Sequence, residues 1–322
     1  MGNKVSAAYK RHSDAKSGHK KKPVSPVPSH PSSLTSQESN SNASDIIRHG
    51  RKFHNFSEST YWLPNDEEEM DRLVGQHFAL KELFGGNILK EAHDYMKFDK
   101  PVRILDIGCG PGTWIMDVAT EFPDCEFVGI DMCPVFPTNI RPPNVTFQHG
   151  NVLEGLPFED ESFDFINLRF FMLALKRDQW AIVMKEIYRL LKPGGCLQSL
   201  ESGMMDRGNE FVLWVGEVFK NVMQDRGQEP YIAFKLANIM REAKFEIIKV
   251  DQRDTYLGQK DPLNREFLWD ICNIVKSVQP FLAGPLGVAP ENYPKFLQKF
   301  CIELQKNPQG QWMIVMTLAR KP

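Results

Sequence analysis

The chain has 322 residues, 42% of them hydrophobic and 25% charged, which is ordinary for a globular protein that buries a full core. No apolar run approaches the roughly 18 residues that a membrane-spanning helix needs, and no signal-peptide stretch follows the first residues. We therefore expect an intracellular, cytoplasmic protein with one domain of catalytic size.

The charge is unevenly distributed along the chain. Residues 1–52 hold ten Lys and Arg against three acids, a balance of +7, which leaves −9 for the remainder of a chain whose net charge is −2. Over residues 23–44, 12 of 22 positions are Ser or Pro. The segment therefore has too few apolar side chains to offset the loss of conformational entropy that ordering it would cost. We expect a disordered, basic, Ser/Pro-rich tail over 1–53 and a folded domain over 54–322, for which no nucleic-acid partner is expected.

The first residues contain a candidate signal for where the protein is located in the cell. Met1-Gly2-Asn3-Lys4-Val5-Ser6 fits the N-myristoylation pattern, with Gly2 as the acylated residue. Seven Lys and Arg follow by position 22 and would add attraction to an anionic membrane. Three alternatives stay open: a peripheral membrane anchor, which we favour, a basic tail without acylation, and a nuclear address that includes Lys20-Lys21-Lys22.

Short apolar runs alternate with helix-like stretches, which predicts an α/β fold with a parallel sheet. A helical leader over 54–100 includes a helix that Asp66 caps, with Glu67, Glu68 and Glu69 in its solvated first turn. The cofactor-binding core spans 101–201 and the lid and C-terminal strands span 202–322. Strands are predicted at 102–106, 126–131, 145–148, 163–168, 196–200, 245–250 and 311–319.

Helices are expected between these strands. One covers 177–191, where Lys192-Pro193-Gly194-Gly195 forms the turn that stops it. Helices at 209–243, 262–278 and 291–305 are predicted to form the lid.

A glycine loop follows the first core strand. Leu105-Asp106-Ile107-Gly108-Cys109-Gly110-Pro111-Gly112-Thr113 lies at a strand-to-helix junction, where side chains on the glycines would keep the backbone away from a nucleotide-like ligand. The GxGxxG spacing of nicotinamide enzymes would need glycine where this chain has Thr113. The spacing therefore favours S-adenosylmethionine over a dinucleotide.

Polar residues at the ends of the next strands are further candidates. Asp131, with Met132 beside it, is placed to accept hydrogen bonds from both ribose hydroxyls. Asn151 and Val152 lie where an amide reaches the adenine edge, although Asn151 is equally suited to a turn, and His149 is expected at the surface. Asn167 and Arg169 are candidates for the methionine end, with a structural ion pair as the alternative for Arg169.

These motifs together resemble class I S-adenosylmethionine-dependent methyltransferases, and more narrowly the fungal trans-aconitate-methyltransferase-like family that includes regulators of secondary metabolism. The resemblance covers roughly residues 61–201. Besides the glycine loop, its marks are Tyr61-Trp62-Leu63-Pro64-Asn65-Asp66, Arg72-Leu73, Gln76-His77, Arg141-Pro142-Pro143-Asn144-Val145, Phe163-Asp164-Phe165-Ile166-Asn167 and Leu191-Lys192-Pro193-Gly194-Gly195.

The resemblance implies a Rossmann-like, seven-stranded, mostly parallel sheet with its last strand antiparallel, and helices on both faces. It implies S-adenosylmethionine at the carboxyl ends of the strands, with Asp106, Gly108, Gly110 and Asp131 around it. Family members often carry an acidic residue where this chain has Asn151, and the region after Glu201 matches only loosely. The resemblance therefore leaves the methyl acceptor open.

The function predicted is methyl transfer to a small-molecule or protein acceptor, and the alternative is a cofactor-binding regulatory scaffold without turnover. The sequence has no HExxH, P-loop or GxSxG motif, so metalloprotease, phosphoryl-transfer and serine-hydrolase chemistry have no support.

Glu201 is either a carboxylate that faces the substrate or a structural group. The six cysteines form no zinc pattern and are expected as reduced thiols. Six aromatic residues are candidates to line a pocket, although aromatic residues at helical spacing more often belong to the core: Trp214, Phe219, Tyr231, Phe234, Trp269 and Phe281.

Overall fold

The computed structural model describes residues 45–55, 59–96 and 100–322. Most of the predicted tail, including the lipidation candidate Gly2, lies outside the described residues. The described part corrects the boundary of the tail, because Ile46–Arg48 (β1) and Arg51–Phe53 (β2) pair as an antiparallel hairpin. Its turn has positive φ at His49 and Gly50, as a tight two-residue hairpin requires. The ordered chain therefore begins before residue 54.

The leader contains the helix that the sequence predicts, Glu67–Phe84 (α1). Asp66 caps it by accepting a hydrogen bond of 3.1 Å from the backbone N–H of Glu69, and Gly85 ends it in the left-handed conformation. The first turn is less solvated than expected. Glu67 and Glu68 are exposed, but Glu69 is buried because its carboxylate pairs with groups inside the protein.

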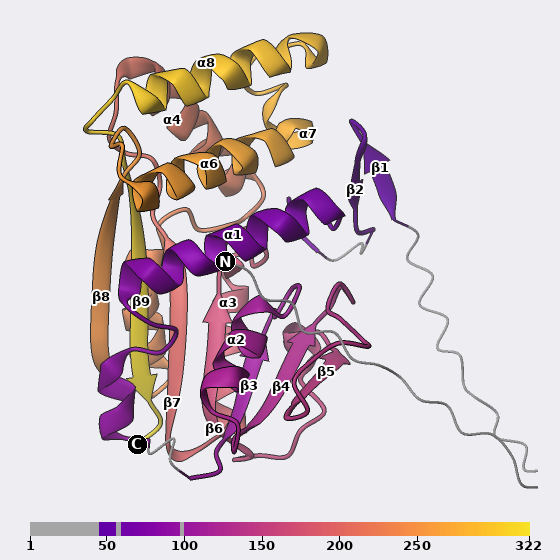
Figure 1. Ribbon diagram of the computed structural model, residues 1–322, viewed down its shortest axis with the longest axis vertical. Coiled ribbons are helices and arrows are strands. Elements are labelled where there is room, and N and C mark those ends of the chain that lie inside the picture. Colours follow the sequence, from indigo (N-terminus) through magenta and orange to yellow (C-terminus); the bar gives the residue numbers. More distant parts are fainter. Residues whose placement is uncertain (1–44, 56–58, 97–99) are drawn as a thin grey trace, which may run out of the picture. The chain divides into compact units, whose positions relative to one another are not determined.

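The seven-stranded sheet is confirmed, in the order β5-β4-β3-β6-β7-β9-β8. Neighbouring strands are parallel except that β9 is antiparallel to both β7 and β8. Figure 1 shows this sheet with helices gathered beyond one end of it. The strands are Arg103–Ile107 (β3), Glu126–Asp131 (β4), Val145–His149 (β5), Phe163–Arg169 (β6), Leu191–Ser202 (β7), Glu246–Tyr256 (β8) and Gln311–Arg320 (β9).

The central strands read as continuous apolar runs because helices cover both faces of the sheet. The turn predicted at residues 192–195 is a different feature in the structure. β7 already begins at Leu191, and between the pairs Phe163–Leu191 and Phe165–Cys196 it carries a bulge that holds these residues. Gly194 has a positive φ of 80° within this bulge.

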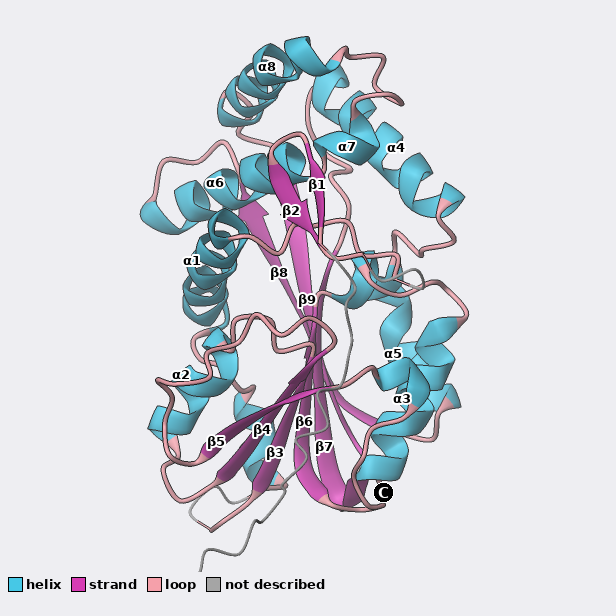
Figure 2. Cartoon of the chain, turned by 90° about the vertical axis from the view of Figure 1, so that its right-hand side faces the viewer, coloured by secondary structure: helices cyan, strands magenta, loops and turns pink. Residues whose placement is uncertain are grey.

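Helices Thr113–Glu121 (α2), Gln179–Leu190 (α3) and Ile232–Glu242 (α5) cover the sheet, and Figure 2 shows α3 and α5 together on one side of it, opposite α2. The prediction that α5 belongs to the lid is wrong. Its apolar stripe, including Leu236 and Met240, is buried as the helix packs on β7, β8 and β9. Single-turn helices occur at Lys90–Asp94 (η1), Val152–Glu154 (η2), Phe171–Leu173 (η3) and Pro290–Asn292 (η4).

The lid consists of Glu210–Asp225 (α4), Pro262–Ser277 (α6), Gln279–Leu282 (α7) and Tyr293–Gln305 (α8), beyond one end of the sheet in Figure 1. α6 packs on both α1 and α8. A disulfide joins Cys272 of α6 to Cys301 of α8, which corrects the expectation of reduced thiols for this pair. The spacing of 29 residues gave no sign of it, because only the packing of the two helices brings their Cα atoms to 5.9 Å.

No helix in the part of the chain that the structure describes is both long enough and apolar enough to cross a lipid bilayer.

Candidate functional site

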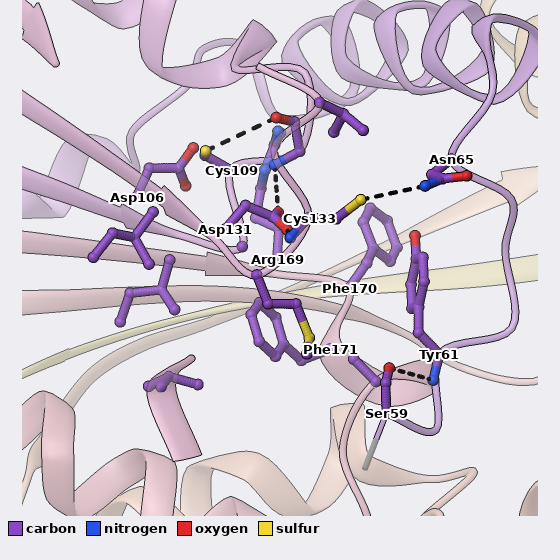
Figure 3. A pocket seen from close by; sticks show the side chains of 18 of the residues that line it. Ser59, Tyr61, Asn65, Asp106, Cys109, Asp131, Cys133, Arg169, Phe170 and Phe171 are labelled. Carbon is purple, nitrogen blue, oxygen red and sulfur yellow. Dashed lines mark hydrogen bonds between the residues drawn. The ribbon is translucent and has the colours of Figure 1, made fainter. Parts of the chain in front are cut away.

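The main cavity lies where β3, β4, β5 and β6 end, and it has a volume of about 330 Å³. Figure 3 shows Asp106, Asp131 and Arg169, from three neighbouring strands, around it. Gly112 and Asn167 are not among the described residues that line it. The other predicted cofactor residues do line it: Asp106, Gly108, Cys109, Gly110, Asp131, Met132, Asn151, Val152 and Arg169.

Hydrogen bonds join the glycine loop to the end of the neighbouring strand β4. The backbone N–H groups of Gly108 and Cys109 both donate to the carbonyl of Ile130, at 2.7 and 3.0 Å. Gly110, at φ 52°, donates its N–H to Oδ2 of Asp131 at 2.8 Å. A Cβ at Gly110 would meet nothing nearer than Leu73 at 3.9 Å. The loop therefore leaves an open edge at Gly110, beside a carboxylate.

The other two glycines have a different reason from the one expected. A Cβ at Gly108 would lie 2.5 Å from the ring of Phe171, and a Cβ at Gly112 would lie 2.5 Å from the ring of Phe147. These glycines leave space for aromatic side chains of the protein itself. A bound ligand is therefore not needed to explain why these positions lack a side chain. The contact of Gly112 with the cofactor stays a prediction, and the structure gives Phe147 as a separate reason for glycine at this position.

Asp131 ends β4 with both carboxylate oxygens facing the loop region. Oδ1 accepts from the N–H of Cys133 and Oδ2 from that of Gly110, both at 2.8 Å. Burial raises the pKa of Asp131, and these backbone donors oppose the rise. A carboxylate oxygen accepts more than one hydrogen bond, so each keeps capacity for a hydroxyl donor.

Asn167 lies within the sheet and not at its edge, which corrects its placement at the methionine end. It is fully buried, and its Nδ2 donates to Oδ1 of Asp106 at 2.8 Å. Its own Oδ1 finds no donor among the described residues. Burial raises the pKa of Asp106 to about 6, against the opposing charge of Arg169 and the bond from Asn167.

The loop after β5 explains the ambiguity of Asn151. Its Oδ1 accepts from the N–H of Leu153 at 3.1 Å and its Nδ2 donates to Glu154 at 2.8 Å, so the side chain caps η2. Asn151 nevertheless lines the cavity with the buried Val152. His149 is exposed, as expected.

Arg169 ends β6 next to the glycine loop. Its Nη1 lies 3.4 Å from Nδ1 of His77, whose Nε2 lies 3.0 Å from Asp117 of α2. Burial lowers the pKa of Arg169, and the charge of Asp106 opposes this. No ion pair of Arg169 is found within the described ranges, so the alternative of a structural pair is not what the structure has.

The leader supplies part of the lining that sequence reasoning missed. Tyr61, Asn65, Leu73, Gln76 and His77 all line the cavity. Several belong to the marks of the family resemblance, which was the available signal, but no role was assigned to them. Their position depends on α1 crossing the end of the sheet, and local sequence does not carry that information.

Of the two roles considered for Glu201, facing the substrate or supporting the structure, its contacts fit the second. It is fully buried in β7 and accepts backbone N–H groups from Phe171 at 2.8 Å and Met172 at 3.1 Å, which holds η3 under the cavity. Burial raises its pKa to about 8, against those two donors. It is not among the described residues that line either cavity.

A second, smaller cavity of about 80 Å³ adjoins the main one. The two share Tyr61, Leu73, Gln76 and Phe170. Of the aromatic candidates, Phe219 lines it, whereas Trp214, Phe234 and Trp269 are partly exposed to solvent. The rest of its lining is mostly apolar: Leu63, Met172, Leu173, Met204, Met205, Ile271, Ile274 and Trp312.

In the described part of the chain, no three His, Cys, Asp or Glu side chains gather as they would around a metal ion.

Comparisons with known proteins agree with this geometry. Residues 104–195 match the family described as "Methyltransferase domain". The N-methyltransferase verN of Clonostachys rogersoniana is 30% identical over 263 residues, which cover 78% of this chain and 89% of that protein. The chain belongs to the class I S-adenosylmethionine-dependent methyltransferases. It is therefore an enzyme of that class, with S-adenosylmethionine as its cofactor.

Other relatives match parts of this methyltransferase. The secondary metabolism regulator laeA of Coprinopsis cinerea is 37% identical over 155 residues, 48% of this chain but only 38% of that protein. The chain thus spans much less than the whole of that regulator. Among solved structures, phosphoethanolamine N-methyltransferase 2 of Haemonchus contortus is 21% identical, with a TM-score of 0.46 over 84% of this chain and 62% of that one.

Proposed function

We propose that this methyltransferase binds its cofactor across the main cavity and transfers the methyl group to an acceptor whose apolar part lies in the smaller cavity. One observation carries the proposal. The open edge at Gly110 and the carboxylate of Asp131 lie in a cavity that shares Tyr61 and Phe170 in its wall with an adjoining apolar one.

The cofactor contacts follow from the order of the strands. Asp131, with Met132 beside it, holds the ribose hydroxyls, and Asn151 and Val152 flank the adenine. Gly108, Cys109 and Gly110 lie along the methionine portion, with Asp106 and Arg169 nearby. When bound, the cofactor supplies a methyl group already activated on a sulfonium. The protein's own task is to align the two reactants and exclude water.

The smaller cavity favours an acceptor with a compact apolar portion. Three methionines in its wall, Met172, Met204 and Met205, are unbranched and adapt to ligands of different shape. Its one charged side chain and its amide are already engaged, since Arg72 pairs with carboxylates and Gln76 donates to Asp270. The cavity therefore recognises apolar surface more than charge.

A regulatory scaffold without turnover is the second candidate, because several relatives are named as regulators of secondary metabolism. The two functions differ in a measurable way. A scaffold binds S-adenosylmethionine and never releases S-adenosylhomocysteine, whereas an enzyme with its acceptor produces one equivalent per methyl group transferred.

Calorimetric titration with S-adenosylmethionine and S-adenosylhomocysteine tests the proposed cofactor site, with NAD as the control ligand. We expect micromolar binding of the first two and none of NAD. Gly110→Arg should abolish binding, because its side chain would enter the cavity at the open edge. Binding that survives in Gly110→Arg would place the cofactor elsewhere.

For the N-terminal segment we propose a peripheral membrane anchor through acylated Gly2 and the basic residues after it. Fractionation of cells that express the wild type and Gly2→Ala tests this. An anchor predicts a membrane fraction that Gly2→Ala moves to the soluble fraction. Equal distributions would favour the unacylated tail, and accumulation in nuclei would favour the nuclear address.

A further inference from the structure

Arg169 is a half-buried cation without a direct ion pair. Its guanidinium lies at the wall of the main cavity, where the charge of Asp106 acts on it, but no carboxylate among residues 45–55, 59–96 and 100–322 forms an ion pair with it. Its hydrogen-bond partner is Nδ1 of His77, at 3.4 Å. Burial of an uncompensated charge is unfavourable, so such a group is normally neutralised by a partner.

The protonation of His77 follows from its other contact. Asp117 accepts hydrogen bonds from Nε2 of His77 at 3.0 Å and from Lys81 and Asn87 at 2.7 Å each. A carboxylate only accepts, so the proton of neutral His77 is on Nε2 and the lone pair of Nδ1 faces Arg169. Burial, and then the charge of Arg169, lower the pKa of His77 to about 4. His77 is therefore neutral at pH 7.

This arrangement orients the guanidinium without a direct ion pair, and Asp106 acts on its charge only from beyond ion-pair distance. Asp117 orients His77, and His77 orients Arg169 as a neutral acceptor. A carboxylate in the place of His77 would form an ion pair with Arg169 and neutralise its charge. The positive charge is instead available to whatever occupies the cavity.

The sheet register shows which part of the cofactor lies there. Leu168 pairs with Ile107, so Arg169 is beside Gly108, while Asp131 is on the opposite side of β3, at the end of β4. A ligand with its ribose at Asp131 that follows the glycine loop therefore reaches Arg169 with its other end. In S-adenosylmethionine that end is the amino-acid portion, which carries a carboxylate.

We infer that Asp117 and His77 are positioning residues that hold Arg169 to bind the methionine carboxylate of the cofactor. The inference rests on the proposed cofactor site and adds to it the group that selects the amino-acid end. A charge-assisted bond between guanidinium and carboxylate is among the stronger polar contacts in proteins.

The test compares two ligands by calorimetry: S-adenosylhomocysteine and 5′-methylthioadenosine, which has the same nucleoside but no carboxylate. Arg169→Met should weaken S-adenosylhomocysteine about 10- to 100-fold and leave 5′-methylthioadenosine unchanged. Arg169→Lys should restore part of the difference. His77→Leu should reduce the preference about 3- to 10-fold, since the guanidinium is then present but free to move.

Lys81→Met is the matched control, because it removes one donor to Asp117 and leaves the bond to His77 in place, so the ligand preference should not change. Equal weakening of both ligands by Arg169→Met would overturn the inference. So would S-adenosylhomocysteine binding that stays intact in Arg169→Met. If the wild type binds neither ligand, the proposed cofactor site itself has failed.

Discussion

Two groups of buried charge differ in how they are balanced. Where α1 meets α6, Arg72 donates to Glu69 at 2.7 Å and to Asp270, Gln76 donates to Asp270 at 2.8 Å, and Ser277 donates to Glu69 at 2.9 Å. The charged groups of this cluster neutralise one another, and the surrounding carboxylates raise the pKa of Arg72.

At the main cavity, by contrast, Arg169 and Asp106 act on each other electrostatically but form no ion pair. Burial lowers the pKa of Arg169 and raises those of Asp106, to about 6, and Glu201, to about 8. The first cluster joins the lid to the leader and has nothing left to offer a ligand. The second keeps unsatisfied charge next to a cavity, which is the condition under which a ligand gains from binding.

The largest effect should come from Arg72→Met. It leaves Glu69 and Asp270 buried without their cation, and breaking a buried pair in this way typically costs about 3–5 kcal/mol of unfolding free energy. Urea denaturation measures the loss. Arg169→Met is the contrasting variant and should cost much less, because Arg169 forms no ion pair and its removal breaks only the long hydrogen bond to His77 and the more distant attraction to Asp106. Similar losses in both variants would break the comparison.

The next effect is a pH dependence that Glu201 contributes. Its pKa is about 8 in the folded protein against 4.5 for the free group. Between these values the folded state keeps a proton that the unfolded state has lost, so the unfolding free energy decreases as pH rises from 4.5 to 8. The slope is on the order of 1 kcal/mol per pH unit.

Glu201→Gln carries no such proton, and its unfolding free energy should vary less with pH over that window. Denaturation at four or five pH values measures both proteins. Parallel profiles for the wild type and Glu201→Gln would mean that Glu201 is ionised at neutral pH, and that the charges near the cavity are better balanced than the structure indicates.

The smallest effect is expected at Asp66, at the edge of the lid junction. Asp66→Ala removes the cap of α1, worth about 1 kcal/mol, together with the pair to Arg51 at 2.6 Å. Asp66→Asn keeps a capping oxygen and removes the charge, so the difference between the two variants isolates the cap. Equal thermal denaturation midpoints for both would show that the ion pair accounts for the whole effect.

The sheet was predictable because its strands are buried on both faces. Their apolar runs stand out from the surrounding helices, and most strand limits were predicted within one or two residues. β8 extends to Tyr256, six residues beyond its prediction, because its outer half is exposed and polar and so lacks the apolar signal. The hairpin at residues 46–53 was not predicted for the same reason, since most of its side chains are exposed.

The site was predictable in its strand-end residues and not in its contacts. Asp131 and Gly110 follow from a local pattern. The triad of Asp117, His77 and Arg169 joins α2, α1 and β6, and no local pattern reports how these three elements meet. The glycines show the same limit, because Phe171 and Phe147 approach them through the fold and not through the sequence.

The position of β9 has a consequence for synthesis on the ribosome. β9 is made after β8 but lies between β7 and β8. When β8 emerges, the strand that will join it to the sheet has not been translated, and α6, α7 and α8 come first. The main-chain groups of β8 therefore gain their partners in the sheet only after α6, α7 and α8 have been synthesised. The edge of β7 that β9 covers likewise stays open until β9 has been made.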